Sequence, residues 1–208
     1  MIRKTLLSLS VTLLCAGIVK AQTEFGLKAG VNFPSYSYAS SENISDVKPR
    51  TSFHLTGYLD ARVASWLYLH PEISLQGKGA RLIESRILGG KEVVQHIMWL
   101  DFPFNFLGKV PIHDLGNIFA GAGPYIGFSM NGENNYADGS VSAVIIYKDN
   151  ALKSVDYGIN FLAGFKLKKR LSLNANYRLG LANIANSSYK WSDDIKNRVF
   201  SLGIGVGL

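Results

Sequence analysis

Apolar and polar residues alternate along several segments of the chain, most regularly in "RLSLNANYRLGL", residues 170–181. Every second residue from Leu171 to Leu181 is apolar, and the residues between them are polar or glycine. Because successive side chains of a β-strand point to opposite faces, this pattern predicts a strand with one apolar and one polar face. A soluble barrel or sandwich would bury the apolar face, whereas a membrane barrel would turn it toward lipid.

The same period of two predicts eight strands. They are Phe25–Phe33, Thr51–Val63, Leu67–Lys78, Ile97–Leu107, Leu115–Met130, Val155–Leu167, Arg170–Ala182 and Asn197–Leu208. The connections between them alternate between long and short. This alternation is typical of an up-and-down barrel with both termini and the short turns at one end and four long loops at the other. In the longest connection, "SVSAVIIYK" is predicted to extend a hairpin beyond the membrane.

The volume of a small barrel decides which face is inside. The apolar positions of the eight strands are mostly Phe, Leu, Ile and Val, and the opposite positions hold the charged residues, Asn and many glycines. The interior of an eight-stranded barrel is just wide enough to be filled by side chains, so it cannot hold the whole apolar set. The sequence therefore predicts an all-β fold, an eight-stranded antiparallel up-and-down transmembrane β-barrel whose apolar face contacts lipid.

The charged residues on the predicted inner face form the candidate site. Five are cations and four are anions, so their charges nearly cancel. Buried charges are tolerated when they are paired. We therefore predict a structural network of ion pairs that closes the lumen, made of Lys28, Asp60, Arg62, Glu72, Lys78, Asp101, Asp156, Lys166 and Arg178.

The amino terminus has the pattern of a secretory signal. Arg3 and Lys4 precede a short apolar stretch, and small residues stand at the spacing for cleavage before Gln22. We expect residues 1–21 to be a signal peptide and residues 22–208 to be the barrel domain of a protein in the cell outer membrane. The signal contains the single cysteine and three basic residues, so the net charge falls from +7 to 19 − 15 = +4. The remaining basic residues are dispersed, which argues against nucleic-acid binding.

Candidate catalytic and metal-binding residues lie on the same inner face. His54, Asp60, His70 and Glu72 would point into the lumen, where they could contribute to a metal site or a nucleophilic site. No G-x-S-x-G motif is present, and we expect these residues to join the hydrogen-bond network, with no catalytic residue, metal or cofactor. The oxygen-rich loop Asn131–Gly139 lacks the twelve-residue spacing of a calcium loop, so we expect it to be a solvated loop tip.

Seven motifs occur in an order that resembles the PorT-like outer-membrane β-barrel family of Gram-negative bacteria. They are "LKAGVNF", "LHPEISLQGKGAR", "WLDFPFNF", "GPYIGF", "YGINFLAGF", "RLSLNANYRLGLANI" and "KNRVFSLGIGVGL". The resemblance implies a small, eight-stranded, OmpA-like outer-membrane barrel, and it links founding members to protein secretion. Such barrels usually end in an aromatic residue that the barrel-assembly machinery recognises, whereas this chain ends in Leu208.

The function that we expect is that of a small integral outer-membrane protein without enzymatic activity. Its role would be structural or one of surface interaction, with outer-membrane lipid around it, the barrel-assembly machinery as its partner during biogenesis, and a protein partner bound through the long loops. A narrow pore or transport component and a membrane-embedded enzyme acting on lipid are the alternatives. The volume argument disfavours a soluble lipocalin-like carrier.

Overall fold

The computed structural model describes residues 23–38, 44–84, 92–136, 141–143, 152–167, 170–186 and 194–208. The predicted signal peptide, residues 1–21, lies outside the described residues. The described part of the chain is built from antiparallel strands. None of its segments is a helix of the length and apolarity needed to cross a membrane.

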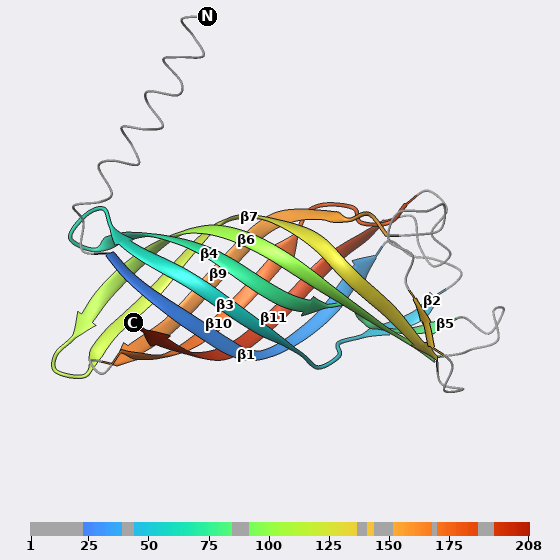
Figure 1. The fold of residues 1–208 in the computed structure, drawn as a ribbon, viewed down its shortest axis with the longest axis horizontal. Helices are drawn as coiled ribbons and strands as arrows, with labels where there is room; N and C mark the ends of the chain where they lie inside the picture. The colour runs from blue at the N-terminus through green and yellow to red at the C-terminus, as the bar shows by residue number, and fades with distance from the viewer. Residues whose placement is uncertain are drawn as a thin grey trace, which may run out of the picture.

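Eight long strands form a closed ring (Figure 1). Each long strand pairs with the next long strand along the chain, including β6 with β7. The last long strand, β11, pairs with β1 and so closes the ring. The predicted eight-stranded up-and-down barrel is therefore confirmed. The strands are β1 (Thr23–Tyr38), β3 (Ser52–Arg62), β4 (Leu67–Lys78), β6 (Glu92–Ile112), β7 (Gly116–Tyr136), β9 (Val155–Leu167), β10 (Leu171–Gly180) and β11 (Ile195–Gly207).

Three short strands extend the wall at the end that carries the long loops. β5 (Arg81–Glu84) pairs with β6, β2 (Ile44–Lys48) pairs with β5, and β8 (Val141–Ala143) pairs with β7. Figure 1 shows β2 and β5 at the end of the barrel opposite the carboxyl terminus. β6 and β7 have 21 residues each, about twice the 9–11 that a tilted transmembrane strand needs. The wall therefore continues well beyond the membrane on the loop side.

The alternation did not predict β2 or β5, because both are short and lie within connections that were expected to be loops. β8 falls inside the "SVSAVIIYK" segment, and its pairing with β7 confirms that a hairpin begins there. The rest of that segment lies outside the described residues.

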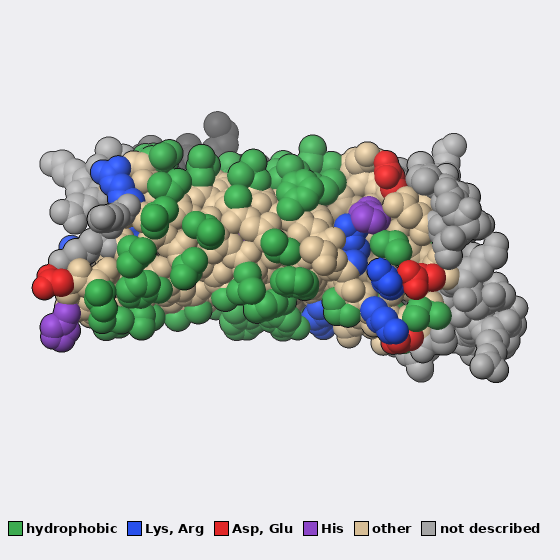
Figure 2. Space-filling view, turned by 90° about the horizontal axis from the view of Figure 1, so that it is seen from below, with side chains coloured by type: hydrophobic (Ala, Val, Ile, Leu, Met, Phe, Trp, Pro, Cys, Tyr) green, Lys and Arg blue, Asp and Glu red, His purple; other side chains and the backbone are tan. Residues whose placement is uncertain are grey.

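The apolar register faces outward at the level of the membrane. Leu173 is 62% exposed and Phe161 is 44% exposed, whereas their neighbours Asn174 and Asn160 are buried. Figure 2 shows hydrophobic side chains over the length of the wall, with the charged side chains gathered toward its two ends. The surface is that of a protein whose solvent is lipid.

Glycines on the inner face make room for the polar side chains of neighbouring strands. A Cβ atom on Gly26 would lie 2.2 Å from the ring of Tyr58, and one on Gly127 would lie 2.2 Å from a carboxylate oxygen of Asp101. Since real Cβ atoms do not approach other atoms so closely, the inner face is packed to the limit at these two points.

The loop end of the barrel encloses a second packing unit, here called the loop-end core. Its members come from the three long strands β1, β6 and β11, from β5 and the turn before it, and from the segments before β9 and after β10, and all are buried. They are Tyr36, Ala80, Leu82, Val93, Ile97, Trp99, Leu152, Ala182, Ile184, Ala185 and Ile195. This end of the barrel is therefore closed by apolar packing.

Candidate functional site

Lys78, the last residue of β4, is buried in the lumen and stands between two carboxylates. Its Nζ lies 3.0 Å from Asp101 Oδ1 and 2.9 Å from Asp156 Oδ2, and all three side chains are at most 1% exposed. Asp156 Oδ2 also accepts hydrogen bonds from the Tyr125 hydroxyl at 3.0 Å and from Asn197 Nδ2 at 2.9 Å. One cation brought in by β4 thus compensates carboxylates on β6 and β9.

Arg178 on β10 connects this group to a second one nearer the turns. Its Nε lies 3.5 Å from Asp101 Oδ2, and one terminal nitrogen lies 3.7 Å from Glu72 Oε2. The guanidinium is 1% exposed. It therefore spans the bore between two buried carboxylates of β4 and β6.

The second group surrounds His70. Its Nδ1 is 2.6 Å from Asp60 Oδ1, and its Nε2 is 2.9 Å from Glu72 Oε1. Glu72 Oε1 also pairs with Lys28 Nζ at 2.6 Å, and Lys109 pairs with Asp60. Both ring nitrogens of His70 are thus held by carboxylates, which fixes the imidazole in one orientation.

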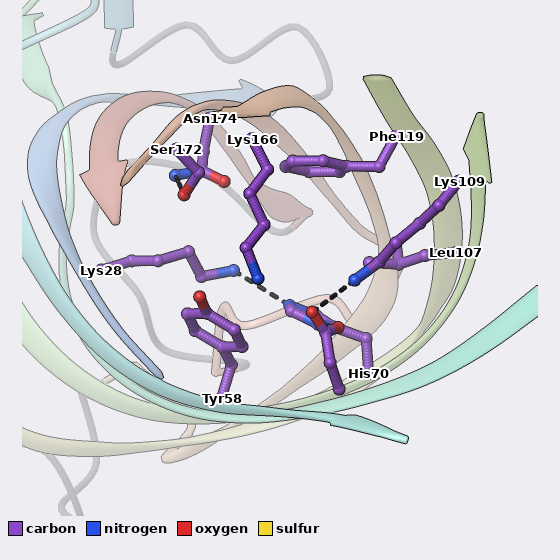
Figure 3. Close-up of a pocket in the computed structure, with 10 residues that line it drawn as sticks. Lys28, Tyr58, His70, Leu107, Lys109, Phe119, Lys166, Ser172 and Asn174 are labelled. Carbon is purple, nitrogen blue, oxygen red and sulfur yellow. Dashed lines mark hydrogen bonds and ion pairs between the residues drawn. The ribbon is translucent and has the colours of Figure 1, made fainter. Parts of the chain in front are cut away.

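A small cavity remains at the turn end, beside this second group (Figure 3). Its volume is about 10 Å³, room for about one water molecule. Lys28, Lys109 and Lys166 point toward it from three walls of the barrel, with Tyr58 and His70 below. Lys166 also pairs with Glu24, near the mouth. The space left in the lumen at this point is too small for a solute larger than water.

The structure brings seven of the nine predicted charged residues together as buried ion pairs. They are Lys28, Asp60, Glu72, Lys78, Asp101, Asp156 and Arg178. We call these seven residues the charged plug. Lys166 is half-buried at the mouth.

Arg62 was predicted to join the network, and that prediction is wrong. It is the last residue of β3, it is exposed, and it donates to the carbonyls of Ala64 and Ser65 in the adjacent turn. The inner register of β3 reaches the rim at this residue, so its long side chain turns out to the backbone of the turn.

Two charged partners were missed, Lys109 and Glu24, because the strands are longer than predicted. β6 continues to Ile112 and β1 begins at Thr23. Extending the period of two from Asp101 places Lys109 on the inner face, and extending it backward from Lys28 places Glu24 there too. The alternation therefore assigns both residues to the inner face, and they were missed because the predicted strands ended too early.

The histidines proposed as metal ligands have other partners. His54 Nδ1 lies 2.8 Å from Asn32 Oδ1, and Asn32 Nδ2 donates to Gln76 Oε1 at 2.7 Å. His70 and Glu72 belong to the ion pairs described above. In the described ranges, no group of three or more His, Cys, Asp or Glu side chains is arranged to hold a metal ion.

Similarity to known proteins agrees with this geometry. The family described as "Outer membrane protein beta-barrel domain" matches residues 20–186. OprG from Pseudomonas aeruginosa, an outer membrane protein, is 13% identical over 90% of this chain and 97% of its own, with a TM-score of 0.51.

Two further structures are similar at lower scores. Ail, the attachment invasion locus protein of Yersinia pestis, is 11% identical over 89% of this chain and 98% of its own, with a TM-score of 0.46. Neisserial surface protein A is 12% identical over 88% and 96%, with a TM-score of 0.45. Comparison with curated protein sequences gives no match. The family match covers most of the chain, and the chain therefore belongs to the outer membrane protein beta-barrel domain family.

Proposed function

We propose that this outer-membrane protein is a closed, non-enzymatic barrel that holds an interaction surface above the membrane. The observation that carries the proposal is the charged plug. Its seven side chains are buried and cross the bore from several walls, so a solute would have to separate ion pairs in order to pass. Separating buried charges is costly when water does not replace the lost partners.

The shape of the loop end supports the interaction role. β6 and β7 rise far beyond the length needed for a membrane span, and β2, β5 and β8 widen the wall there. The loop-end core stabilises this extension from within. A barrel that served only as a membrane anchor would not need this second packing unit. We propose that a protein partner binds at the loop end.

Conductance of the purified barrel in a planar lipid bilayer tests closure. We expect no stable single-channel steps from the wild type, with a porin reconstituted in parallel as the positive control. A variant with two truncated plug residues, Lys78→Ala with Arg178→Ala, should show steps if it still inserts. Stable steps from the wild type would favour the alternative of a narrow pore.

We further propose that the chain belongs to the PorT-like group and that its loop end serves protein secretion. The seven ordered motifs of the sequence support membership of the group, and the secretion role is taken only from the resemblance to its founding members. Comparison of the proteins exported by a deletion strain and by the same strain carrying the gene would test it. Unchanged export would leave the surface-interaction role without the secretion link.

A further inference from the structure

The lipid-facing wall carries a groove of about 400 Å³ across β1, β3 and β4. Its sides are Phe25, Leu27, Leu59, Pro71, Ile73 and Leu208. Its floor includes Gly57, where a Cβ atom would meet only Leu27, at 3.9 Å. The groove is therefore open because Gly57, which faces outward, has no side chain, whereas the outward residues around it are large and apolar.

The β-ladder under the groove lacks a hydrogen bond. β3 and β4 pair as far as Tyr58↔Glu72, omit the pairs of Leu59 and Asp60, and resume in the same register at Ala61↔Leu69. The residue opposite Leu59 in this register is Pro71, which has no N–H group. The carbonyl of Leu59 is thus left without its ladder donor.

The same interruption of the ladder occurs between the next two neighbouring strands. Between β4 and β6 the pairing omits Glu72 and Ile73 and resumes in the same register at Ser74↔Asp101. The residue opposite Glu72 is Pro103, so the carbonyl of Glu72 also lacks its ladder donor. Because the Glu72 side chain is turned into the lumen and is 1% exposed there, the groove meets this residue through its backbone.

The two acceptors lie shallowly in the membrane, on the side of the short turns. The short turn beside these strands carries Trp66, which is 60% exposed and stands five residues from Pro71. Trp and Tyr concentrate at the membrane–water interface. Unpaired carbonyls just inside such a girdle carry a free-energy cost in hydrocarbon. A lipid with a hydrogen-bond donor at this depth would relieve that cost.

We propose that this groove binds the acyl chain of a membrane lipid that carries a hydroxyl group near its carboxyl end. The chain lies along the apolar sides, and the hydroxyl donates to the free carbonyl of Leu59 or Glu72. The groove is continuous with the lipid-facing belt, so its occupant comes from the membrane itself. An unsubstituted chain fills the same space and leaves both acceptors unpaired.

A second outward groove serves as the internal control. Its volume is about 240 Å³, and it lies over β7, β9 and β10, lined by Phe161, Ala163, Ala175 and Tyr177 among others. The ladders of β9 with β7 and with β10 run beneath it without an omitted pair. It offers apolar space without a free backbone acceptor.

The test uses two probes, myristic acid and its β-hydroxylated analogue, each with a photoreactive group at the methyl end. The barrel is embedded in nanodiscs of dimyristoyl phosphatidylcholine, whose chains have no hydroxyl. We expect the hydroxylated probe to bind about five- to tenfold more tightly, the gain of about one hydrogen bond. Cross-links should map to β1, β3 and β4. Both probes carry the same carboxylate, so head-group charge cancels in the comparison.

Variants separate the groove from the acceptors. Gly57→Phe fills the groove and should abolish labelling by both probes, whereas the matched change Ala163→Phe on the control groove should leave it unaltered. Gly57→Leu is the milder replacement if the first variant does not fold, which heat-modifiable gel mobility reports. Pro71→Val with Pro103→Val supplies both missing N–H groups, and it should remove the preference for the hydroxylated probe while binding of the plain chain persists.

Three results would overturn the proposal. One is equal affinity of the wild type for the two probes. Another is a preference that survives the paired proline replacements. The third is labelling spread evenly over both grooves, which would indicate a general lipid surface with no selective site.

Discussion

The two halves of β6 show opposite polarity. At the level of the membrane, Asp101 and Asn105 face the lumen, and the phenylalanines between them face lipid. Nearer the loops, Val93 and Ile97 point inward, and the Glu92 side chain is 40% exposed on the outside. The inner face of this strand is thus mostly polar in its second half and mostly apolar in its first.

The reversal follows the solvent outside the wall. Where lipid surrounds the barrel, apolar side chains gain nothing by pointing inward, and the narrow bore is filled by paired charges. Where water surrounds it, apolar burial is again the main source of stability. The charged plug and the loop-end core therefore fill the inside of the barrel in two different ways. Which of the two is stable depends on whether lipid or water surrounds the wall.

The largest effect is expected from Lys78→Met in the charged plug. The change keeps a long side chain but removes the cation from between Asp101 and Asp156, both fully buried. Leaving a buried charge without its partner costs about 3–5 kcal/mol. Urea unfolding in lipid vesicles, followed by heat-modifiable mobility, should show a matching loss of stability.

The control for this change is Lys48→Met. Lys48 is on β2, and its side chain is 57% exposed in a pair with Asp46. Exposed pairs contribute about 0–1 kcal/mol, so the unfolding midpoint should hardly move. A plug variant as stable as this control would show that Lys78 does not compensate the two carboxylates.

A smaller and more local effect is expected from Leu82→Ala in the loop-end core. Leu82 is fully buried, and truncating a buried leucine costs about 2–3 kcal/mol when the site partly collapses. We expect the loop end to open without the membrane barrel, so proteolysis there should accelerate while the heat-modifiable mobility of the barrel stays the same. Equal losses at both places would mean that the two units unfold as one.

The sequence predicted the membrane half better than the loop half for a physical reason. Strict alternation assigns faces from Leu171 to Leu181 without ambiguity, since one face is all apolar. At the loop end the same alternation continues through Gln95, Ile97 and Trp99, but the apolar residues have moved to the inner face. A rule that assigns every apolar residue to lipid fails there, and the loop-end core was not predicted.

Rim residues were the other source of error. Arg62 and Lys109 both stand near the turns, where a long side chain reaches either the lumen or the backbone of the turn. Arg62 donates to turn carbonyls and Lys109 pairs with Asp60. Alternation gives the side of the wall but not the reach of the side chain, so it does not separate the two cases.

The smallest predicted effect is a pH dependence confined to the loop end. Partial burial lowers the pKa of His96 below its ordinary value of 6.5, and the nearby Arg50 guanidinium adds to the shift, opposed by Glu133. His96 therefore binds a proton less readily in the folded state than in the unfolded state. Stability contributed by neutral His96 is complete well above pH 6.5 and is lost as the pH falls below that value.

Protease sensitivity of the loop end at about pH 8 and about pH 5 measures this contribution, on either side of the ordinary histidine pKa. The wild type should lose more resistance on acidification than His96→Gln, since glutamine does not titrate. Carboxylates that titrate in the same range affect both proteins alike. His113→Gln is the matched control, because His113 is exposed in the turn between β6 and β7 at the other end. An acid response in His96→Gln as large as in the wild type would assign the loop-end pH dependence to other groups and leave the apolar core as the main support of that half of β6.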